Sequence, residues 1–407
     1  MRFTILFALA LALGAHVSVA EARTWIVRTD GTGDAATIQM GIDFAAAGDT
    51  VLLAGEVFTG TGNWNLDLHG KAITVRSEGG DPAGCTIGLG GLYAHRGFRF
   101  HSGEGPDSRI EGLTIADGSH SQGAGILVQN ASPTVVDCRI LRCVSQSDGG
   151  GVSCTDNASP VFIGCTIAEN DAYFYGGGIR LELGTEVELS ACTLRSNTAV
   201  RGGGIYSYGG TVALEGCVFL ENVSEEDGGA IYLHGDDGSV LDCVFARNAA
   251  ETGWGGAVYC GNSSPRIGRC TFWGNAADVA GGIHCRIASH PLIENTIIAA
   301  SASGCALYAA DVGYEPVLTC CDLHGNPGGD WIGLIADQYG VEGNISADPL
   351  FCDPHAGDLT LAASSPCLPG NHPDGHDCGL IGALGHGCSG PISVEQTTWG
   401  GVKARFR

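Results

Sequence analysis

A repeat of about 26 residues dominates this chain and limits what it can fold into. Each repeat begins with a small residue followed by a branched apolar one. These pairs are Gly125-Ile126, Gly151-Val152, Gly178-Ile179, Gly204-Ile205, Ala230-Ile231, Ala257-Val258, Gly282-Ile283 and Ala306-Leu307. A second mark follows 12 to 14 residues later, at Cys138, Cys165, Cys192, Cys217, Cys243, Cys270, Asn295 and Cys321. Such a short fixed period indicates one structural unit stacked on copies of itself.

The repeats have the pattern of β-structure. Short runs with alternating apolar positions are interrupted by glycine pairs and polar turns. No helical pattern of ten residues separates these runs, which argues against βαβ units. We therefore predict an all-β fold, a single-stranded right-handed parallel β-helix of roughly 10–12 coils with an N-terminal helical cap. Equivalent residues of neighbouring coils should then form ladders with a spacing of about 4.8 Å.

Two ladders are expected inside or at the corners of such a β-helix. Asparagine follows the cysteine mark by five residues in most repeats, at Asn170, Asn197, Asn222, Asn248, Asn275 and Asn326. These side chains can pass amide hydrogen bonds from coil to coil. The cysteines either fill a narrow interior as free thiols, which we favour, or crosslink neighbouring coils as disulfides.

The N-terminus has the features of an export signal. Arg2 is followed by an apolar run over residues 3–13 and by small residues before a cleavage site after Ala20 or Ala22. No other stretch approaches the 20 or so apolar residues of a transmembrane helix. We predict a signal peptide, no transmembrane segment, and a monomer that is secreted to the cell surface or the extracellular space.

The remaining chain divides by its repeat marks. We predict a signal peptide at 1–22, an N-terminal cap at 23–50, a β-helix at 51–346, a closing coil or C-terminal cap at 347–390 and a tail at 391–407. The cap should include an amphipathic helix over Ala36–Ala47 that ends at Gly48. The tail finishes with basic and aromatic residues and is either a disordered end or a sorting or surface-attachment signal.

Four cysteines lie beyond the repeats, at Cys352, Cys367, Cys378 and Cys388. In an exported protein such cysteines in a loop-rich segment favour disulfide bonds. Cys378 and Cys388 could instead bind zinc with nearby histidines, but their spacing fits no familiar zinc site.

The charge balance excludes one class of partner. The chain has 20 Lys and Arg against 44 Asp and Glu, a formal net charge of −24. Nucleic-acid binding requires a basic surface that displaces counterions, so we expect no nucleic-acid partner.

Strand alternation predicts which residues face outward. If Ile205 points inward, Tyr206 and Tyr208 point outward, and the same holds one coil above and below. The candidate ligand-binding residues on this strip are Arg180, Tyr206, Tyr208, Tyr232, His234, Tyr259 and His284. Aromatic surfaces beside polar side chains suit sugar rings. The alternative is that an outward tyrosine ladder only favours β-structure and shields the backbone.

The candidate catalytic residues are weaker. A β-helix lyase needs a base, and Arg180 and Arg286 are the basic candidates on the strip, although the pKa of arginine suits a base poorly. A glycoside hydrolase needs two carboxylates, for which Glu182 with Asp236 or Asp237 is available. Nothing in the spacing selects these residues, so catalysis is not expected.

An acidic cluster borders the same strip. Glu225, Glu226 and Asp227, near Asp236 and Asp237, either form a solvated acidic edge or hold Ca²⁺ through oxygen ligands. We favour the solvated edge and predict no metal site and no other cofactor.

The repeats resemble those of bacterial polymorphic outer-membrane proteins. The resemblance rests on Gly228-Gly229-Ala230-Ile231 and Gly255-Gly256-Ala257-Val258, and on the Phe-x-x-Asn segments Phe219–Asn222, Phe245–Asn248 and Phe272–Asn275. In that family such repeats form the exported β-helix of surface adhesins.

Both ends resemble another group. Asp30-Gly31-Thr32-Gly33-Asp34 is similar to the N-terminal cap of pectin-lyase-like β-helix proteins, and Asp348-Pro349-Leu350-Phe351 to the closing coil of secreted β-helix proteins. This cap occurs in enzymes and non-enzymes, so it implies a fold only. We predict an exported protein that acts in binding or adhesion to carbohydrate or a surface partner. The alternative is a polysaccharide lyase or glycoside hydrolase of the pectin-lyase-like fold.

Overall fold

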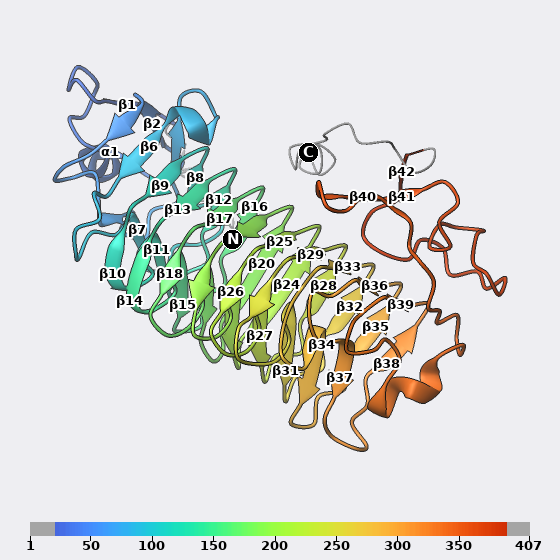
Figure 1. The fold of residues 1–407 in the computed structure, drawn as a ribbon. Coiled ribbons are helices and arrows are strands. Elements are labelled where there is room, and N and C mark those ends of the chain that lie inside the picture. Colours follow the sequence, from blue (N-terminus) through green and yellow to red (C-terminus); the bar gives the residue numbers. More distant parts are fainter. Residues whose placement is uncertain (1–20, 389–407) are drawn as a thin grey trace, which may run out of the picture.

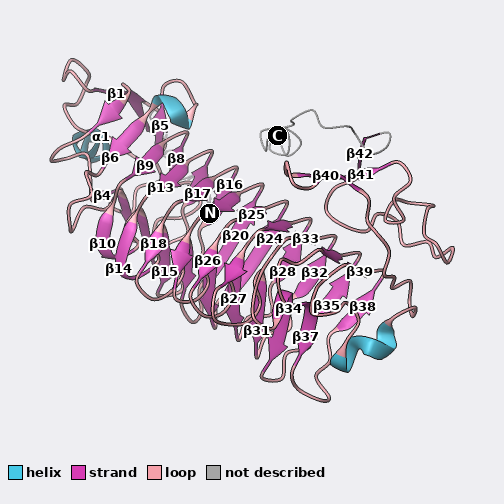
Figure 2. Cartoon of the chain, viewed as in Figure 1, coloured by secondary structure: helices cyan, strands magenta, loops and turns pink. Residues whose placement is uncertain are grey.

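The chain winds into an elongated parallel β-helix, as the repeat predicts (Figures 1 and 2). The structure is a computed structural model and describes residues 21–388. Most of the predicted signal peptide and the predicted tail lie outside the described residues. The strands form four parallel sheets, which we call A, B, D and C in the order in which the chain passes through them; six coils contribute a strand to all four, and the others have no strand in sheet D.

Sheet A is the longest, with 12 strands, in agreement with the expected number of coils. Its strands are β1 (Thr24–Arg28), β2 (Thr50–Ala54), β5 (Thr74–Ser77), β8 (Arg109–Glu111), β12 (Thr134–Val136), β16 (Val161–Ile163), β20 (Glu186–Ser190), β24 (Thr211–Glu215), β28 (Ser239–Leu241), β32 (Arg266–Gly268), β35 (Leu292–Glu294) and β38 (Val317–Thr319). Because β1 is already the first strand of this sheet, the segment predicted as a separate cap belongs in part to the first coil.

Sheet B has 11 strands and follows sheet A within each coil. Its strands are β3 (Val57–Phe58), β6 (Thr86–Gly88), β9 (Thr114–Ala116), β13 (Arg139–Leu141), β17 (Thr166–Ala168), β21 (Thr193–Arg195), β25 (Val218–Leu220), β29 (Val244–Ala246), β33 (Thr271–Trp273), β36 (Ile297–Ala299) and β39 (Asp322–His324).

Sheets D and C form the other side of the coil. Sheet D has six strands, β10 (Ser119–Gln122), β14 (Val144–Asp148), β18 (Asp171–Ala172), β22 (Thr198–Ala199), β26 (Val223–Ser224) and β30 (Ala249–Ala250). Sheet C has ten, β4 (Leu66–Asp67), β7 (Phe98–Phe100), β11 (Ile126–Gln129), β15 (Val152–Thr155), β19 (Ile179–Leu181), β23 (Ile205–Tyr208), β27 (Ile231–His234), β31 (Val258–Gly261), β34 (Ala280–Arg286) and β37 (Cys305–Ala309).

The core consists of ladders of identical or similar residues. Phe219, Phe245 and Phe272 stack with ring centroids 4.8 and 4.6 Å apart. The cysteines of the ladder are free and buried, which confirms the favoured prediction. This stacking follows from the one-to-one parallel register, which places the same position of each repeat above its counterpart.

The asparagine ladder also forms as predicted. Asn222 is fully buried, and its Nδ2 donates to Leu194 O (2.9 Å) and to Asn248 Oδ1 (3.0 Å). Asn197 donates in turn to Asn222 Oδ1 from both its backbone N and its Nδ2. Each amide therefore bonds to the backbone of the coil before it and to the asparagine of the coil after it.

The seventh repeat has a register one residue different from the prediction. Phe272 pairs with Ile298, so Thr296 and not Asn295 takes the cysteine position. Cys270 N donates to Thr296 Oγ1 at 3.3 Å. Asn295 instead has φ 48°, the left-handed conformation that Arg269 (φ 50°) adopts in the preceding coil. Asparagine suits that conformation, which explains why it is displaced from the expected position.

The N-terminal helix is shorter than predicted. Helix α1 spans Ile38–Phe44, and Thr37 caps it by accepting a hydrogen bond from Met40 N at 3.2 Å. The chain is extended at Ala45, and Ala46 N donates to Asp49 Oδ2 at 2.9 Å. That local hydrogen bond ends the helix before the expected Gly48. A 3₁₀ turn, η1, follows at Pro82–Gly84.

The C-terminal segment does not close the β-helix, which corrects the prediction for residues 347–390. Its strands β40 (Phe351–Asp353), β41 (Asp358–Ala362) and β42 (His386–Cys388) form a small separate sheet beside the solenoid (Figure 1, red). Leu359 and Leu384 pack on the outer face of sheet B against Val218 and Trp273. That face is apolar and can be buried only by a segment that runs along it.

The end of the β-helix is covered by a different segment. Ile335, in the 3₁₀ helix η2 (Gly333–Gln338), is buried in the main core, and Trp331 packs against it. This arrangement protects the last coil from pairing with another chain.

Two disulfide bonds hold the C-terminal segment. Cys352 binds Cys388, as expected for this part of the chain, but Cys378 binds Cys320 at the edge of the last repeat. Cys367 is free and buried, and its thiol donates to Asp322 Oδ2 at 3.2 Å. The prediction of disulfides is thus correct for three of the four cysteines. No helix in residues 21–388 has the length and hydrophobicity that a bilayer crossing requires.

Candidate functional site

The outward strip on sheet C has the predicted register. Arg180 pairs with Tyr206, Tyr206 with Tyr232, Tyr232 with Tyr259, and Tyr259 with His284. The three tyrosine rings stack with centroids 4.9 and 4.8 Å apart and are nearly parallel. We call this stack the aromatic column.

The aromatic column is not open to solvent, which corrects the expectation of a flat binding surface. Tyr206, Tyr232 and Tyr259 are only 7, 8 and 3% exposed. Tyr175 stacks on Tyr206 with ring centroids 4.5 Å apart, and Tyr175 and Trp254 pack against the aromatic column. The glycine turn before each strand is tight as well: a Cβ atom at Gly202 or Gly228 would lie 2.9 Å from the Cα of the tyrosine four residues later. Both glycines have positive φ, so this close approach requires glycine. The ring faces are used for stacking and are not available to a sugar.

Other predicted residues of the strip lie at its edge. Tyr208 is 53% exposed and stacks on His234 with centroids 4.8 Å apart. Arg180 is largely buried and donates to Glu182 at 2.8 Å. Arg286 lies over the Trp254 ring at 4.6 Å. Tyr208 and His234 are thus the predicted ligand-binding residues that keep both a polar group and a surface position.

His284 is a buried, neutral member of the stack. It lies between Tyr259 and Tyr308 and is 3% exposed. Burial, with a contribution from nearby Arg286, lowers the pKa of His284 to about 4. An uncharged ring at neutral pH suits an aromatic stack better than an ionic contact.

The proposed carboxylate pair does not form. Asp236 is fully buried and accepts hydrogen bonds from Gly238 N and Val212 N, which fixes the turn after β27. Asp237 accepts from Ser264 N at 2.7 Å. Both carboxylates are used by the backbone of neighbouring turns and do not face Glu182 as a free partner.

The acidic edge is partly neutralised. Glu226 pairs with Arg201 at 2.5 Å, and Asp227 lies 3.8 Å from the same guanidinium. Burial raises the pKa of Asp227 above its ordinary value. Within residues 21–388, no three or more His, Cys, Asp or Glu side chains are grouped so that they could hold a metal ion.

A cavity lies away from the strip on sheet C, between the outer face of sheet B and the C-terminal segment. We call it the C-terminal cavity, and its volume is about 710 Å³. Trp273, Ala299 and Phe351 give it an apolar lining. Its polar residues are Arg247, His324, Asp348, His355 and Ser364.

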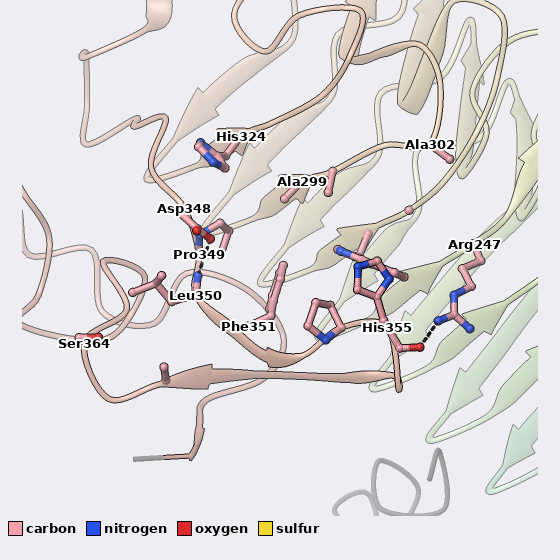
Figure 3. Close-up of a pocket in the computed structure, with 15 residues that line it drawn as sticks. Arg247, Ala299, Ala302, His324, Asp348, Pro349, Leu350, Phe351, His355 and Ser364 are labelled. Atoms are coloured by element: carbon pink, nitrogen blue, oxygen red, sulfur yellow. Dashed lines mark hydrogen bonds between the residues drawn. The ribbon is translucent and has the colours of Figure 1, made fainter. Parts of the chain in front are cut away.

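The polar residues lie at two ends of the C-terminal cavity (Figure 3). His324 and Asp348 are at one end, and Arg247 and His355 are at the other. Arg247 Nη2 donates to His355 O at 2.6 Å, and its guanidinium lies 5.3 Å from the Trp273 ring centroid. The His355 ring meets Trp273 edge-on, with centroids 5.5 Å apart. The cavity therefore combines an aromatic surface with hydrogen-bonding groups at both ends.

The repeat pattern did not identify this cavity. Arg247 and His355 are 108 residues apart in sequence, and only the return of the C-terminal segment brings them together. One signal was present in the repeat itself. Trp273 takes the outward position that alanine holds in the two adjacent coils, Ala246 and Ala299, so a bulky aromatic stands between two small residues.

One solved structure of similar fold supports the β-helix architecture. The crystal structure of pectate lyase Pel9A is similar with a TM-score of 0.53 at 12% identity, over 91% of this chain and 98% of that one. A mutant of the PL6 family alginate lyase AlyGC gives a TM-score of 0.36 at 16% identity, over 87% and 57% of the two chains. No curated protein sequence matches.

A family model gives the assignment. The model described as "Right handed beta helix region" matches residues 63–219 and 177–345, which together span most of the described solenoid. This match agrees with the parallel sheets and the one-to-one strand register of the structure. The chain therefore belongs to the right-handed β-helix family.

Proposed function

We propose that this protein binds carbohydrate in the C-terminal cavity, at the cell surface or outside the cell. The observation that carries the proposal is the combination in one cavity of an aromatic side chain that keeps some exposed surface, the half-buried Phe351, with polar side chains at both ends. Trp273 is 8% exposed and forms the buried wall behind it. Sugar rings have apolar faces and polar rims, so they pair with aromatic surfaces bordered by hydrogen-bonding groups.

The size of the cavity agrees with this proposal. A volume of about 710 Å³ lies within the range of roughly 300–1,000 Å³ that is usual for small-molecule sites. Asp348 and His324 can exchange hydrogen bonds with sugar hydroxyls at one end. At the other end, Arg247 already donates to a backbone oxygen, so its role is to support the wall beside Trp273.

The chemistry of the lining favours binding over cleavage. Asp348 is the single carboxylate among the residues that line the cavity. Glycoside hydrolysis generally uses two carboxylates, one on each side of the scissile bond. Cleavage by a lyase remains the competing outcome, and the test below detects it directly.

Export is part of the proposal. The disulfides Cys320–Cys378 and Cys352–Cys388 suit an oxidising compartment, which supports the signal peptide predicted at the N-terminus. The resemblance of the repeats to those of polymorphic outer-membrane proteins supports a role at a surface.

A glycan array tests the proposed function. The wild-type protein is compared with Phe351→Leu, which keeps an apolar side chain but removes the aromatic ring, with the exposed rim variant Asp348→Asn, and with Tyr208→Ala on sheet C as the matched control. We expect binding to one glycan class that weakens at least about tenfold in the first two variants, because stacking and hydrogen bonds are lost, and is unchanged in the control. Asp348→Asn keeps the acceptor for Leu350 N, so it should fold normally.

Three results would contradict the proposal. These are no binding to any glycan, loss of binding in Tyr208→Ala but not in the cavity variants, and release of reducing or unsaturated ends from a bound polysaccharide. Loss of binding in Tyr208→Ala alone would place the binding site on sheet C. Release of reducing or unsaturated ends would show that the protein is an enzyme.

A further inference from the structure

A second, smaller cavity lies at the N-terminal end of sheet C, far along the solenoid from the C-terminal cavity. Its volume is about 230 Å³. Six residues line it: Asn65, Asp67, Arg96, Arg99, His101 and His120. We propose that this cavity is an anion site that takes one oxyanion group, a carboxylate, phosphate or sulfate. The proposal is independent of carbohydrate binding at the other end.

The strand register brings these residues together. Asp67 on β4 pairs with Arg99 on β7, on the outward side of sheet C. Arg96 precedes β7, and His120 lies on β10 of sheet D, where the chain turns the corner into sheet C. Two sheets therefore contribute to the cavity, which places its side chains on a rigid scaffold.

Arg96 is a buried cation whose hydrogen-bond acceptors are all uncharged. It is 6% exposed, and it donates to Gly123 O (2.8 Å), Gln122 O (2.6 Å) and His120 Nδ1 (2.8 Å). A buried charge normally has an ionic partner, because removing it from water is costly. An anion in the cavity would supply that partner.

Neither arginine of this site forms an ion pair within the described part of the chain. Nine other arginines do, as expected for a protein with a net charge of −24. Arg99 donates from Nε and Nη2 to Gln129 Oε1, at 3.3 and 3.0 Å. A neutral amide oxygen is a weaker acceptor than an oxyanion, so an anion can replace it.

Asp67 does not balance the two guanidinium groups. Its carboxylate accepts from His101 Nε2 at 3.0 Å and lies 3.2 Å from His69 Nδ1. One carboxylate, already engaged by two histidines, therefore faces two arginines. The cavity keeps an excess of positive charge.

His120 gives the cavity a further donor. Its Nδ1 accepts from Arg96 Nη2 and from Ser121 N (2.9 Å), which assigns the ring proton to Nε2. Burial, together with the charges of Arg96 and Arg99, lowers the pKa of His120 to about 4. The burial of Arg96 itself, with repulsion from Arg99, lowers the pKa of Arg96 to about 10. Both shifts arise chiefly from burial, and the positive charge of the neighbouring arginines adds to them.

Planar oxyanions fit this chemistry. The guanidinium group presents several N–H donors in one plane and binds carboxylate, phosphate or sulfate oxygens through paired hydrogen bonds. A cavity of 230 Å³ has room for one such group with a few water molecules, each of which occupies about 30 Å³ in the liquid.

Isothermal titration calorimetry with sodium phosphate, sulfate and acetate, at constant ionic strength in chloride, tests the proposal. The full chain is compared with Arg99→Gln and with Arg76→Gln, which removes an exposed arginine from sheet A and serves as the control. We expect saturable binding of at least one anion, weakened at least about tenfold in Arg99→Gln and by less than about twofold in the control. The preferred anion identifies the kind of group that the site takes.

The pKa of His120, followed by an NMR pH titration of its imidazole protons with and without the anion, provides a second measurement. The groups that face His120 are Arg96 and Arg99, with the Tyr93 ring stacked on it. A bound anion should raise the pKa of His120 from about 4, because it offsets these charges. Addition of the anion to Arg99→Gln should leave the pKa of His120 unchanged. Absence of saturable binding for all three anions, or equal binding in Arg99→Gln and the control, would overturn the proposal.

Discussion

Each asparagine of the ladder forms hydrogen bonds with buried backbone groups that no water molecule would reach. Asn222 has no exposed surface, and its amide links the backbone of its own coil to the coils before and after it. A buried amide in this position is stabilising only while all of its partners are in place. Loss of one asparagine therefore affects three coils.

Asn222→Ala should lower the free energy of unfolding by about 3 kcal/mol. The change removes a donor from Leu194 O and the acceptor of Asn197 N, while Asn197 Nδ2 keeps its hydrogen bond to Ile167 O, and each unsatisfied buried group costs roughly 1–3 kcal/mol. Urea denaturation measures the loss. The control Asp278→Ala changes an exposed side chain and should shift stability by less than about 0.5 kcal/mol. Equal effects in the two variants would show that the ladder does not stabilise the coil.

The alternation of apolar residues predicted which way the tyrosine side chains point, but it did not predict how exposed they are. The register of Tyr206, Tyr232 and Tyr259 and their outward direction follow from the two-residue period of a strand. Their burial follows from side chains outside these strands, Tyr175 and Trp254, that pack against the column, and alternation within a strand does not describe these contacts.

The C-terminal segment is the element that differs most from the prediction. It lacks the repeat marks, so the sequence indicated a change of structure near residue 347, but nothing local indicated that it would run along sheet B. The apolar outward positions Val218, Val244 and Trp273 contained that information, because a solvent-facing sheet would carry polar residues there.

Asp322 makes the attachment of this segment dependent on pH. It lies on the outward side of β39 and accepts from Ala347 N (3.0 Å) and Cys367 Sγ (3.2 Å). Burial raises the pKa of Asp322 to about 7, well above the value of about 4 expected in the unfolded chain. The folded protein therefore binds more protons than the unfolded one between these pH values, and its stability falls as the pH rises.

The pH dependence can be measured by comparing wild type with Asp322→Asn. The wild-type protein should lose on the order of 4 kcal/mol between pH 4 and pH 8 through this group, and the difference between the two proteins should level off above pH 7. Asparagine keeps an acceptor for Ala347 N and does not titrate. A difference that is constant over this range would show that Asp322 is ionised throughout in the folded protein.

The two disulfides fix the same segment covalently. In the double variant Cys378→Ser with Cys388→Ser, we expect a loss of about 2–4 kcal/mol for each bond and increased binding of an apolar dye as the outer face of sheet B is uncovered. The far-ultraviolet circular dichroism of the β-helix should change little. Reductant should reproduce the dye binding in the wild type and add nothing in the variant. No difference in dye binding would mean that packing alone holds the segment.

The whole molecule is a solenoid with a functional candidate near each end. Its repeat predicted the fold and the ladders, because these depend only on residues one period apart, and it favoured free thiols over disulfides in the cysteine ladder. The C-terminal cavity depends on contacts across about 100 residues, such as that between Arg247 and His355, and the anion site on a corner between two sheets. Neither geometry follows from a 26-residue period.

The most direct test of carbohydrate binding is a crystal structure of the protein soaked with the oligosaccharide that gives the strongest array signal. We predict density for a sugar ring inside the C-terminal cavity, against Phe351 and within hydrogen-bond distance of Asp348 or His324. Density over Tyr208 and His234 on sheet C, with the C-terminal cavity filled by water alone, would contradict the account.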